Sequence, residues 1–294
     1  MMQPRGLLQL LAAVTLAAAS ITLLNGCKGD SAPVTKTVPI PASPELRALP
    51  ATVDPLTDPF TSDTWKNAAW LTLGASLRDA RTPPLTRVAA VYGATHLYVA
   101  FLCQSPEAGT PPITSDVAGR PIPPNALDQD RAEIWLDTST AQNGTDVFAI
   151  VVTSSGQVQR TWYRSTMAPE PLEDGSPNFK HPMMQIPDYP VPGLDIRNTR
   201  GTLQGHPAWA TVVAIPFHSL PLPLRVDSAQ VKPGSHWKVN LIRADFIKKE
   251  GQPREVLQAN LAPIYPSCQQ VSPYRMTKLL LDSSSSAVAL SPGN

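Results

Sequence analysis

The sequence is poor in charged residues, which make up 16% of its 294 residues against about 25% in an average globular protein. The charges that are present nearly cancel, because 24 Lys and Arg residues face 23 Asp and Glu residues and leave a formal net charge of +1. A chain without a basic excess lacks the electrostatic attraction on which binding to nucleic acid depends. We therefore expect no nucleic-acid partner.

Catalytic and metal-binding motifs are also missing. The five histidines show no His-x-x-x-His or Glu-x-x-His spacing of a metal site, and neither a Gly-x-Ser-x-Gly elbow nor a phosphate-binding glycine loop is present. Asp128, Asp130 and Glu133 supply carboxylates, but nothing fixes the separation between two of them that glycoside hydrolysis needs. The sequence predicts a protein that is not an enzyme, with no cofactor and no metal ligands.

Cysteine is scarce and proline is abundant. Three cysteines are too few for a disulfide scaffold, and an odd number leaves one without a partner. The 33 prolines, about 11% of the chain, outnumber the 16 glycines and are roughly twice the usual share. Because proline fixes φ and lacks an N–H group, this composition favours short strands joined by rigid loops over long helices.

The N-terminal segment has the pattern of a secretory signal. Arg5 precedes an apolar stretch from Leu7 to Leu24, which ends in Leu24-Asn25-Gly26-Cys27. The tetrapeptide resembles the lipobox of bacterial lipoproteins, in which the cysteine is lipid-modified and becomes the new N-terminus. The resemblance implies that residues 1–26 are a signal peptide and that Cys27 is the lipidation site. An uncleaved transmembrane anchor is the alternative, since 18 residues can just span a bilayer.

The lipobox resemblance also implies a location and a partner. It places the protein in a bacterial cell envelope, anchored by lipid in the membrane and, in an organism with two membranes, in the outer membrane or facing the periplasm. Cleavage before Cys27 would remove the cation of Arg5 and reduce the formal charge from +1 to zero. A neutral mature chain favours an uncharged ligand.

Composition divides the rest of the chain into three segments. Residues 27–58 are rich in Pro, Ser, Thr and Ala and are expected to form a semi-rigid linker. Residues 59–282 contain no low-complexity break and are expected to form one folded domain. Residues 283–294, which begin with a serine run, are expected to form a flexible tail.

The folded segment is expected to consist of strands. Residues 87–92 and 96–103 are rich in β-formers and flank a turn at 93–95, so they predict a hairpin. A short helix is expected at residues 63–69, and the other expected strands are 133–137, 147–153, 158–164, 211–215, 237–246 and 276–281. Strands without alternating helices indicate an all-β fold, a β-sandwich with short helical insertions.

Five motifs, in this order, resemble the carbohydrate-binding module family 9-like domains, whose jelly-roll β-sandwich is shared with DOMON-type domains. They are Trp65-Lys66-Asn67-Ala68, His96-Leu97-Tyr98-Val99-Ala100-Phe101, Asp130-Arg131-Ala132-Glu133-Ile134-Trp135-Leu136-Asp137, Trp209 followed by Ala214-Ile215-Pro216-Phe217, and Gly234-Ser235-His236-Trp237-Lys238-Val239-Asn240-Leu241-Ile242-Arg243. The resemblance covers residues 59–282. It implies non-catalytic binding of a glycan or oligosaccharide, and in some relatives a structural calcium ion.

The chain departs from these relatives at several positions. Ala149 and Val151 stand where relatives place polar sugar contacts, and Val212 stands where glutamate is common. A structural envelope lipoprotein that has lost the ligand site is therefore one alternative function. A DOMON-like haem or redox domain is the other, with axial ligands from a histidine and Met183, Met184 or Met276.

Strand alternation selects the candidate ligand contacts. It puts Arg131, Glu133 and Trp135 on the face opposite the apolar side chains of residues 131–137. A flat ring beside a bidentate donor and a carboxylate suits a sugar, although Arg131 could instead simply pair with Glu133 while Trp135 packs under a loop.

Three further residues complete the predicted carbohydrate site. Trp162 is expected to act as an exposed platform, and Asn240 and Arg243 are expected to donate to hydroxyl groups from a strand without a cleanly apolar face. For Arg243, a bridge to a carboxylate inside the sandwich, such as Glu133, is the alternative. Cys103 and Cys268 remain after lipidation, and in the oxidising envelope a disulfide between them is a reasonable prediction, with two small buried thiols as the alternative.

Overall fold

The computed structural model describes residues 43–51, 53–75, 83–105, 129–139, 146–165, 183–247, 255–262 and 276–283. The predicted signal peptide, Cys27 and Cys268 lie outside the described residues, as does the predicted tail apart from Ser283. These assignments stay predictions. In the described part of the chain, no helix has the length and apolar character that crossing a bilayer requires.

Strands make up most of the described residues. The helical pieces are one short helix, α1 (Asp63–Lys66), and three 3-10 turns, η2 (Phe217–Ser219), η3 (Leu222–Leu224) and η4 (Ser228–Gln230). The strands are β1 (Leu46–Pro50), β2 (Leu71–Thr72), β3 (Gly74–Ala75), β4 (Thr86–Tyr92), β5 (His96–Gln104), β6 (Arg131–Asp137), β7 (Val147–Thr153), β8 (Val158–Ser165), β9 (Met183–Pro187), β10 (Asp195–Leu203), β11 (His206–Pro216), β12 (His236–Ile247), β13 (Glu255–Asn260) and β14 (Thr277–Leu281).

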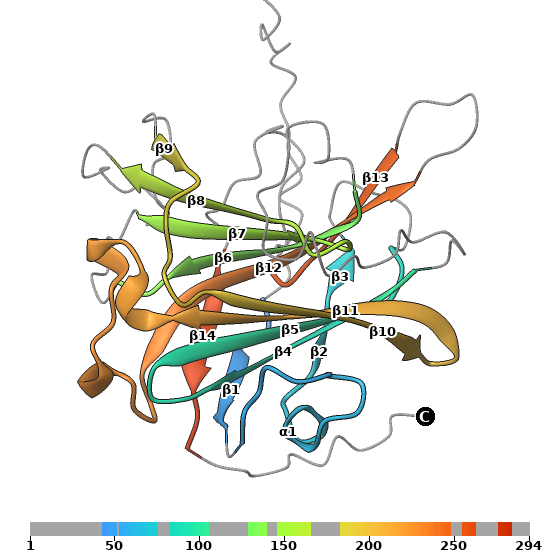
Figure 1. Cartoon of the computed structure of the whole chain (residues 1–294), viewed down its shortest axis with the longest axis horizontal. Helices are drawn as coiled ribbons and strands as arrows, with labels where there is room; N and C mark the ends of the chain where they lie inside the picture. Colours follow the sequence, from blue (N-terminus) through green and yellow to red (C-terminus); the bar gives the residue numbers. More distant parts are fainter. Residues whose placement is uncertain are drawn as a thin grey trace, which may run out of the picture. The chain divides into compact units, whose positions relative to one another are not determined.

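The described strands form one curled sheet that folds into two layers. Its path runs β10-β11-β5-β4-β1-β14-β12-β6-β7-β8-β9, with β2, β3 and β13 attached beside it. In Figure 1, β4, β5, β10 and β11 lie in the lower layer, and β6, β7, β8 and β12 lie in the upper layer. The parallel pairing of β1 with β14, in which Leu46 lies opposite Leu279, joins the layers. The predicted β-sandwich is confirmed.

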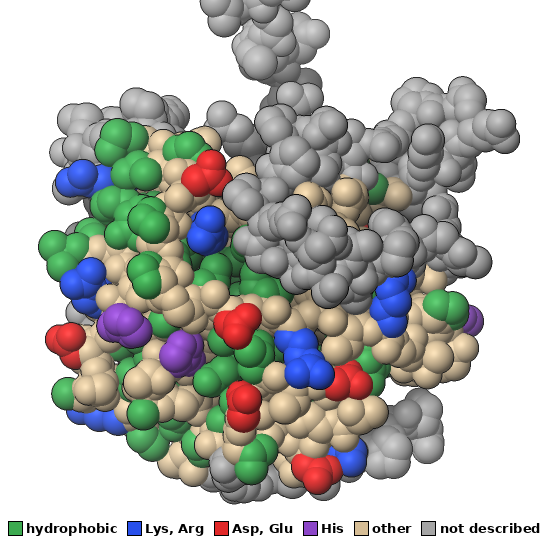
Figure 2. All heavy atoms as spheres, in the orientation of Figure 1, with side chains coloured by type: hydrophobic (Ala, Val, Ile, Leu, Met, Phe, Trp, Pro, Cys, Tyr) green, Lys and Arg blue, Asp and Glu red, His purple; other side chains and the backbone are tan. Residues whose placement is uncertain are grey.

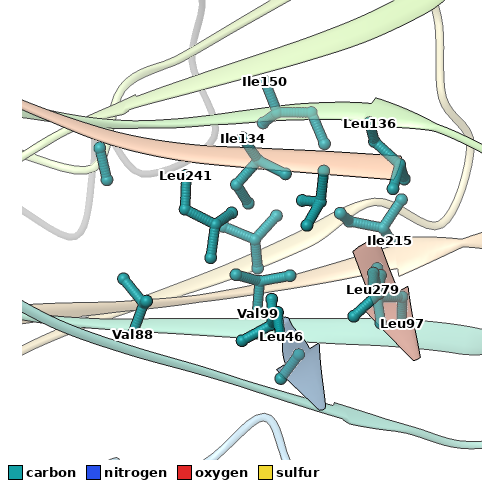
Figure 3. Packing of buried hydrophobic residues seen from close by; sticks show 14 of the residues in the cluster. Leu46, Val88, Leu97, Val99, Ile134, Leu136, Ile150, Ile215, Leu241 and Leu279 are labelled. Atoms are coloured by element: carbon teal, nitrogen blue, oxygen red, sulfur yellow. The ribbon is translucent and has the colours of Figure 1, made fainter. Parts of the chain in front are cut away.

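Alternating apolar side chains fill the space between the layers. Leu97 and Val99 project from the lower layer toward Ile134 and Leu136 of the upper layer, as Figure 3 shows, and all four are buried. Burial of this kind is the main stabilising contribution to such a fold, at about 25 cal/mol per Å² of apolar surface. The two-residue alternation expected for residues 131–137 is therefore present, with its apolar side chains facing the core.

Residues Leu46–Pro50 belong to the folded domain and not to the linker that was predicted for residues 27–58. These residues form β1, which pairs with β14 on one side and with β4 on the other, and Leu46 and Ala48 are completely buried. Pro50 lies at the last position of the strand, where a missing N–H group interrupts little of the ladder. Proline-rich composition suggested a spacer, but the alternation of Leu46 and Ala48 with polar or exposed neighbours makes this segment part of the folded domain.

The outer face of the lower layer is covered by the segment around α1. Trp65 is completely buried there, packs with Val91 and Val212, and donates its indole N–H to the carbonyl oxygen of Pro55 at 2.8 Å. Pro55 also belongs to the predicted linker. Val212, one of the departures from the family pattern, thus packs beneath a tryptophan and does not face a ligand.

Candidate functional site

The structure distributes the predicted carbohydrate contacts over different parts of the sandwich. Four lie on the outer face of the upper layer, whereas the other two point into or against the core between the layers. The outer-face residues are Arg131, Glu133, Trp135 and Asn240, and the inner ones are Trp162 and Arg243.

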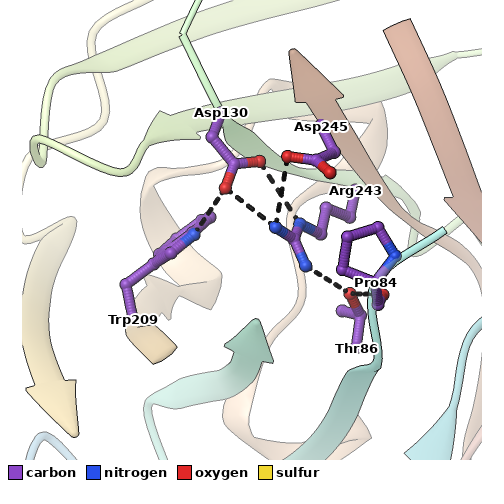
Figure 4. A network of polar contacts seen from close by, with 6 residues as sticks. All are labelled: Pro84, Thr86, Asp130, Trp209, Arg243 and Asp245. Carbon is purple, nitrogen blue, oxygen red and sulfur yellow. Dashed lines mark hydrogen bonds and ion pairs between the residues drawn. The ribbon is translucent and has the colours of Figure 1, made fainter. Parts of the chain in front are cut away.

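Arg243 is a structural residue buried inside the sandwich. Its guanidinium donates from Nε to Asp130 Oδ1 at 3.2 Å, from Nη2 to Asp130 Oδ2 at 2.9 Å and from Nη1 to Thr86 Oγ1 at 3.1 Å. Asp245 Oδ1 lies 3.4 Å from Nη2, and Trp209 donates its indole N–H to Asp130 Oδ2 at 2.7 Å. Figure 4 shows how this network connects β12, β4 and β11 with the residue that precedes β6.

The prediction that Arg243 donates to a ligand is therefore wrong, and so is Glu133 as its internal partner. In the β12–β6 ladder, Arg243 lies opposite Ala132, so its side chain shares the inner face with Ala132 and not the outer face with Glu133. Burial opposes the charged form of Arg243, but the carboxylate of Asp130 outweighs it, and the pKa of Arg243 is raised above its usual value. The group is a permanently charged, paired cation.

Trp162 is not the exposed platform that was predicted. It is partly buried against the main core and donates its indole N–H to Asp146 Oδ2 at 3.3 Å. Tyr189 meets its ring in a T-shaped contact with the centroids 5.5 Å apart, and the guanidinium of Arg164 lies 5.5 Å from its ring centroid. On its other side, Trp162 lies opposite Ile186 of β9, an edge strand that was not predicted.

Arg131, Glu133 and Trp135 form a connected group on the outer face. Arg131 donates from Nε to Glu133 Oε1 at 2.7 Å, and Trp135 donates its indole N–H to Glu133 Oε2 at 3.1 Å. The ring of Trp135 lies 5.0 Å from that of Tyr163, centroid to centroid, and Arg131 stacks 5.1 Å from the centroid of Phe246. Glu133 and Trp135 are only 4% and 5% exposed. The pairing that the sequence left open as an alternative is present.

Asn240 anchors the backbone beside this group. Its Oδ1 accepts from the backbone N–H of Ala262 at 3.1 Å, and its Nδ2 donates to the carbonyl oxygen of Ala262 at 3.4 Å. The side chain is completely buried. Both ends of the amide are thus engaged with the chain itself, and the role predicted for Asn240, donation to sugar hydroxyls, is replaced by a structural one.

Asn260 is a residue of this face that the sequence did not indicate. Ladder register places Glu133 opposite Ile242 and Ile242 opposite Asn260, so the three side chains lie in one row across β6, β12 and β13. Asn260 is 3% exposed, and neither its Oδ1 nor its Nδ2 has a hydrogen-bond partner in the described part of the chain. A buried polar group left without a partner costs about 1–3 kcal/mol. No sequence signal pointed to Asn260 because β13 was not among the expected strands.

We call Arg131, Glu133, Trp135, Tyr163 and Asn260 the outer-face cluster. It combines a carboxylate, an unsatisfied amide and two aromatic rings, and the Arg131–Glu133 pair makes it neutral overall. Its carboxylate, Glu133, projects from the outer face, whereas the carboxylate of Asp130 lies in the inner network. Such a cluster can hold a neutral polar ligand but does not place two carboxylates around one bond.

Metal and haem ligands gain no support from the described side chains. Among them, no group of three His, Cys, Asp or Glu residues that could hold a metal ion is present. Met184 is 43% exposed on the edge strand β9, whereas Met276 packs in the apolar cluster with Trp135. These two methionines therefore do not share a site.

Cys103 is a free, completely buried thiol on the inner face of β5. Burial raises the pKa of Cys103 to about 12. The predicted disulfide with Cys268 is not formed at Cys103, because that side chain is enclosed in the core between the layers; Cys268 lies outside the described residues. Cys103 takes the other form that the sequence left open, a small buried thiol.

Comparison with known proteins identifies structural relatives only. No family profile matches the sequence, and no curated protein matches it either. A crystal structure of a candidate carbohydrate-binding protein from Bacteroides uniformis is similar to this chain with a TM-score of 0.54 and 10% identity, covering 82% of this chain and 100% of that one. At this identity the likeness shows the shared β-sandwich fold and no more.

Two further similar structures are family 9 carbohydrate-binding modules. Both come from Caldicellulosiruptor kristjanssonii, one in complex with glucose and one with cellotriose. They are 13% and 14% identical, with TM-scores of 0.48 and 0.45, and the matches cover 83% and 84% of this chain and 99% of each module.

Proposed function

We propose that this chain is a non-catalytic carbohydrate-binding protein whose ligand contacts the outer-face cluster. The observation that carries the proposal is Asn260, a buried amide without a hydrogen-bond partner among the described residues, which lies in the same row of the sheet as the carboxylate of Glu133, with Ile242 between them. A sugar hydroxyl can donate to the amide oxygen and accept from the amide nitrogen, which would satisfy both atoms at once. The described protein atoms offer Asn260 no such partner.

The electrostatics of the cluster favour an uncharged ligand. Arg131 neutralises Glu133 through the 2.7 Å contact, and Trp135 binds the second carboxylate oxygen. An incoming hydroxyl would therefore meet aligned dipoles and aromatic faces without a net charge. Arg131, whose side chain is 20% exposed, gives the cluster its contact with solvent. The Bacteroides relative is described as a candidate carbohydrate-binding protein, which agrees with this assignment.

The surface on the face drawn in Figure 2 is also consistent with a neutral ligand. Figure 2 shows acidic and basic side chains interspersed on the face in view, with no region dominated by one sign. The formal net charge of +1 agrees with that distribution. Long-range attraction of a polyanion is therefore weak at best, and the selection of a ligand depends on short-range contacts in the outer-face cluster.

The test replaces the unsatisfied amide. Asn260→Leu keeps the branching of the side chain but removes both polar atoms, so it should abolish glycan binding while leaving the fold intact. Asn67→Leu is the matched control, because Asn67 is exposed at the end of α1 and far along the chain from the cluster. Glycan-array binding of the full chain, followed by affinity electrophoresis, provides the readout. A folded wild-type protein that binds no glycan would refute the proposal and favour the structural lipoprotein.

Membrane anchoring through Cys27 is a separate part of the proposal. The support for this part is the tetrapeptide Leu24-Asn25-Gly26-Cys27 after an apolar stretch. An anchor of this kind would hold the domain in the bacterial cell envelope. Several acyl chains on one cysteine hold a protein stably at a membrane, where a single chain would not. In a bacterial host grown with labelled palmitate, the wild-type chain should incorporate the label and Cys27→Ser should not. A wild-type chain that stays in the membrane fraction without the label would favour an uncleaved apolar anchor instead.

A further inference from the structure

A cavity lies at the end of the sandwich where β12 begins, on β12 residues that precede Asn240 of the outer face. Its volume is about 680 Å³, within the range of about 300–1,000 Å³ that small-molecule sites occupy. Its lining comes from the residues that follow β6, Thr138 and Ser139, from the loop that carries η4, and from the first residues of β12. The 3-10 turns near it are among the orange coils in Figure 1.

The walls of this cavity are held in place by hydrogen bonds. Thr138 bonds to the carbonyl oxygen of Leu224, and Ser235 Oγ donates to the carbonyl oxygen of Gln230 at 2.7 Å. Gly234 and Leu281 connect the loop to β14, with the Gly234 N–H donating to the Leu281 carbonyl at 2.8 Å. A site that is formed before binding loses less conformational entropy when a ligand enters.

The ionisable side chains that line the cavity are basic. They are Lys232, His236 and Lys238, and the described lining contains no Asp or Glu. Two acids are chain neighbours of lining residues. Asp137 is buried behind the wall, where Lys238 Nζ lies 3.3 Å from its Oδ2 and Ser139 donates to its Oδ1, and Asp227 takes part in the capping box of η4. Lys232 is exposed and forms no ion pair with a described side chain, so its ammonium group is accessible to an anionic ligand.

The rest of the lining is suited to a hydroxylated ring. Val226, Ala229, Pro233 and Trp237 supply apolar surface, Ser139 and Ser235 supply hydroxyl oxygens that can accept hydrogen bonds, and Gln230 supplies a side-chain amide. We propose that this cavity is a second ligand site, for an acidic sugar that carries hydroxyl groups and a carboxylate. This site shares no residue with the outer-face cluster, so it does not depend on the function proposed above.

The experiment compares two ligands that differ only in charge. Digalacturonate and its dimethyl ester are titrated against the full-length chain at low salt, with the indole N–H signal of Trp237 followed by NMR. Digalacturonate should shift this signal in a saturable manner, and the ester should bind about tenfold more weakly because it lacks the ionic contact. Inorganic sulfate, which has charge but no ring, should not saturate. Equal binding of the two sugars, saturation by sulfate or the absence of any shift would overturn the proposal.

Two variants locate the site within the molecule. Lys232→Gln should weaken digalacturonate binding about tenfold, whereas Lys66→Gln, the same change at an exposed lysine at the end of α1, should not change it. Ala229→Phe should block the cavity, because Ala229 lines it from an exposed turn where a larger side chain can be accommodated. Binding that survives both cavity variants would refute the assignment. Asn260→Leu should leave this binding unchanged, which separates failure here from failure of the outer-face site.

Discussion

Removing the carboxylate of Asp130 should destabilise the sandwich strongly. Asp130 accepts two hydrogen bonds from the guanidinium of Arg243 and one from the indole of Trp209. In Asp130→Ala, Arg243 stays completely buried with a charge that only Asp245, 3.4 Å away, still offsets. The perturbation therefore tests whether this network, and not a ligand, uses Arg243.

The size of the effect follows from burial. Breaking a buried ion pair by removing one partner costs about 3–5 kcal/mol, and the side chain of Asp130 is 13% exposed while Asp245 remains. We therefore expect the lower end, a loss of about 3 kcal/mol in the free energy of unfolding. For a domain of this size, each kcal/mol lowers Tm by about 2–4 °C, so Tm should fall by roughly 6–12 °C.

Urea denaturation and thermal melting, followed by circular dichroism, measure this change. Glu45→Ala is the control, because Glu45 pairs with Arg47 and Lys278 at the surface and its loss should cost less than about 1 kcal/mol. The double variant Asp130→Leu with Arg243→Met, which removes both charges, should recover much of the lost stability. If Asp130→Ala is no less stable than Glu45→Ala, the structural role of the network is wrong.

Two further predictions concern the core. Leu46→Ala should lower the free energy of unfolding by about 2–5 kcal/mol, because the side chain is completely buried between the layers. Val53→Ala, at a side chain that is 61% exposed, should change the free energy of unfolding measured in urea by less than about 0.5 kcal/mol. Equal effects of the two substitutions would mean that Leu46 belongs to a linker and not to the folded domain. In a chain with Cys27 and Cys268 replaced by serine, the Cys103 thiol should not react with a disulfide reagent at pH 8 until the protein unfolds. Rapid labelling of the native protein would contradict this burial. Burial raises the pKa of Cys103 from 9.0 to about 12, so the thiol of the unfolded chain loses its proton at a lower pH than that of the folded chain. The contribution of the buried thiol to stability is therefore complete below pH 9 and is lost as the pH rises toward 12.

The sequence predicted those parts of the fold that depend on local alternation. The hairpin expected at residues 87–103 corresponds to β4 and β5, because β-branched and aromatic residues alternate there on both sides of a short turn. The two faces of β6 were likewise assigned correctly. Each of these features is decided by residues that are neighbours in the chain.

The parts that failed depend on which strands become neighbours in space. Leu46–Pro50 was assigned to a linker because its pairing partners, β4 and β14, are remote in sequence. The sequence predicted that Arg243 contacts either a ligand or Glu133. The register places Arg243 opposite Ala132, so its side chain lies on the inner face and pairs with Asp130. Asn260 was missed for the same reason, since only the pairing of β13 with β12 places it in the row that contains Ile242 and Glu133.

The most direct measurement of the central proposal is a pair of titrations on the wild-type chain and on Asn260→Leu, with binding of a neutral oligosaccharide and stability toward urea determined on the same samples. The account predicts that wild type binds and that Asn260→Leu does not. It also predicts that the variant is more stable by about 1–3 kcal/mol, because its two buried atoms without partners are gone. A variant that is equally or more stable and binds the sugar as well as wild type does would contradict the account.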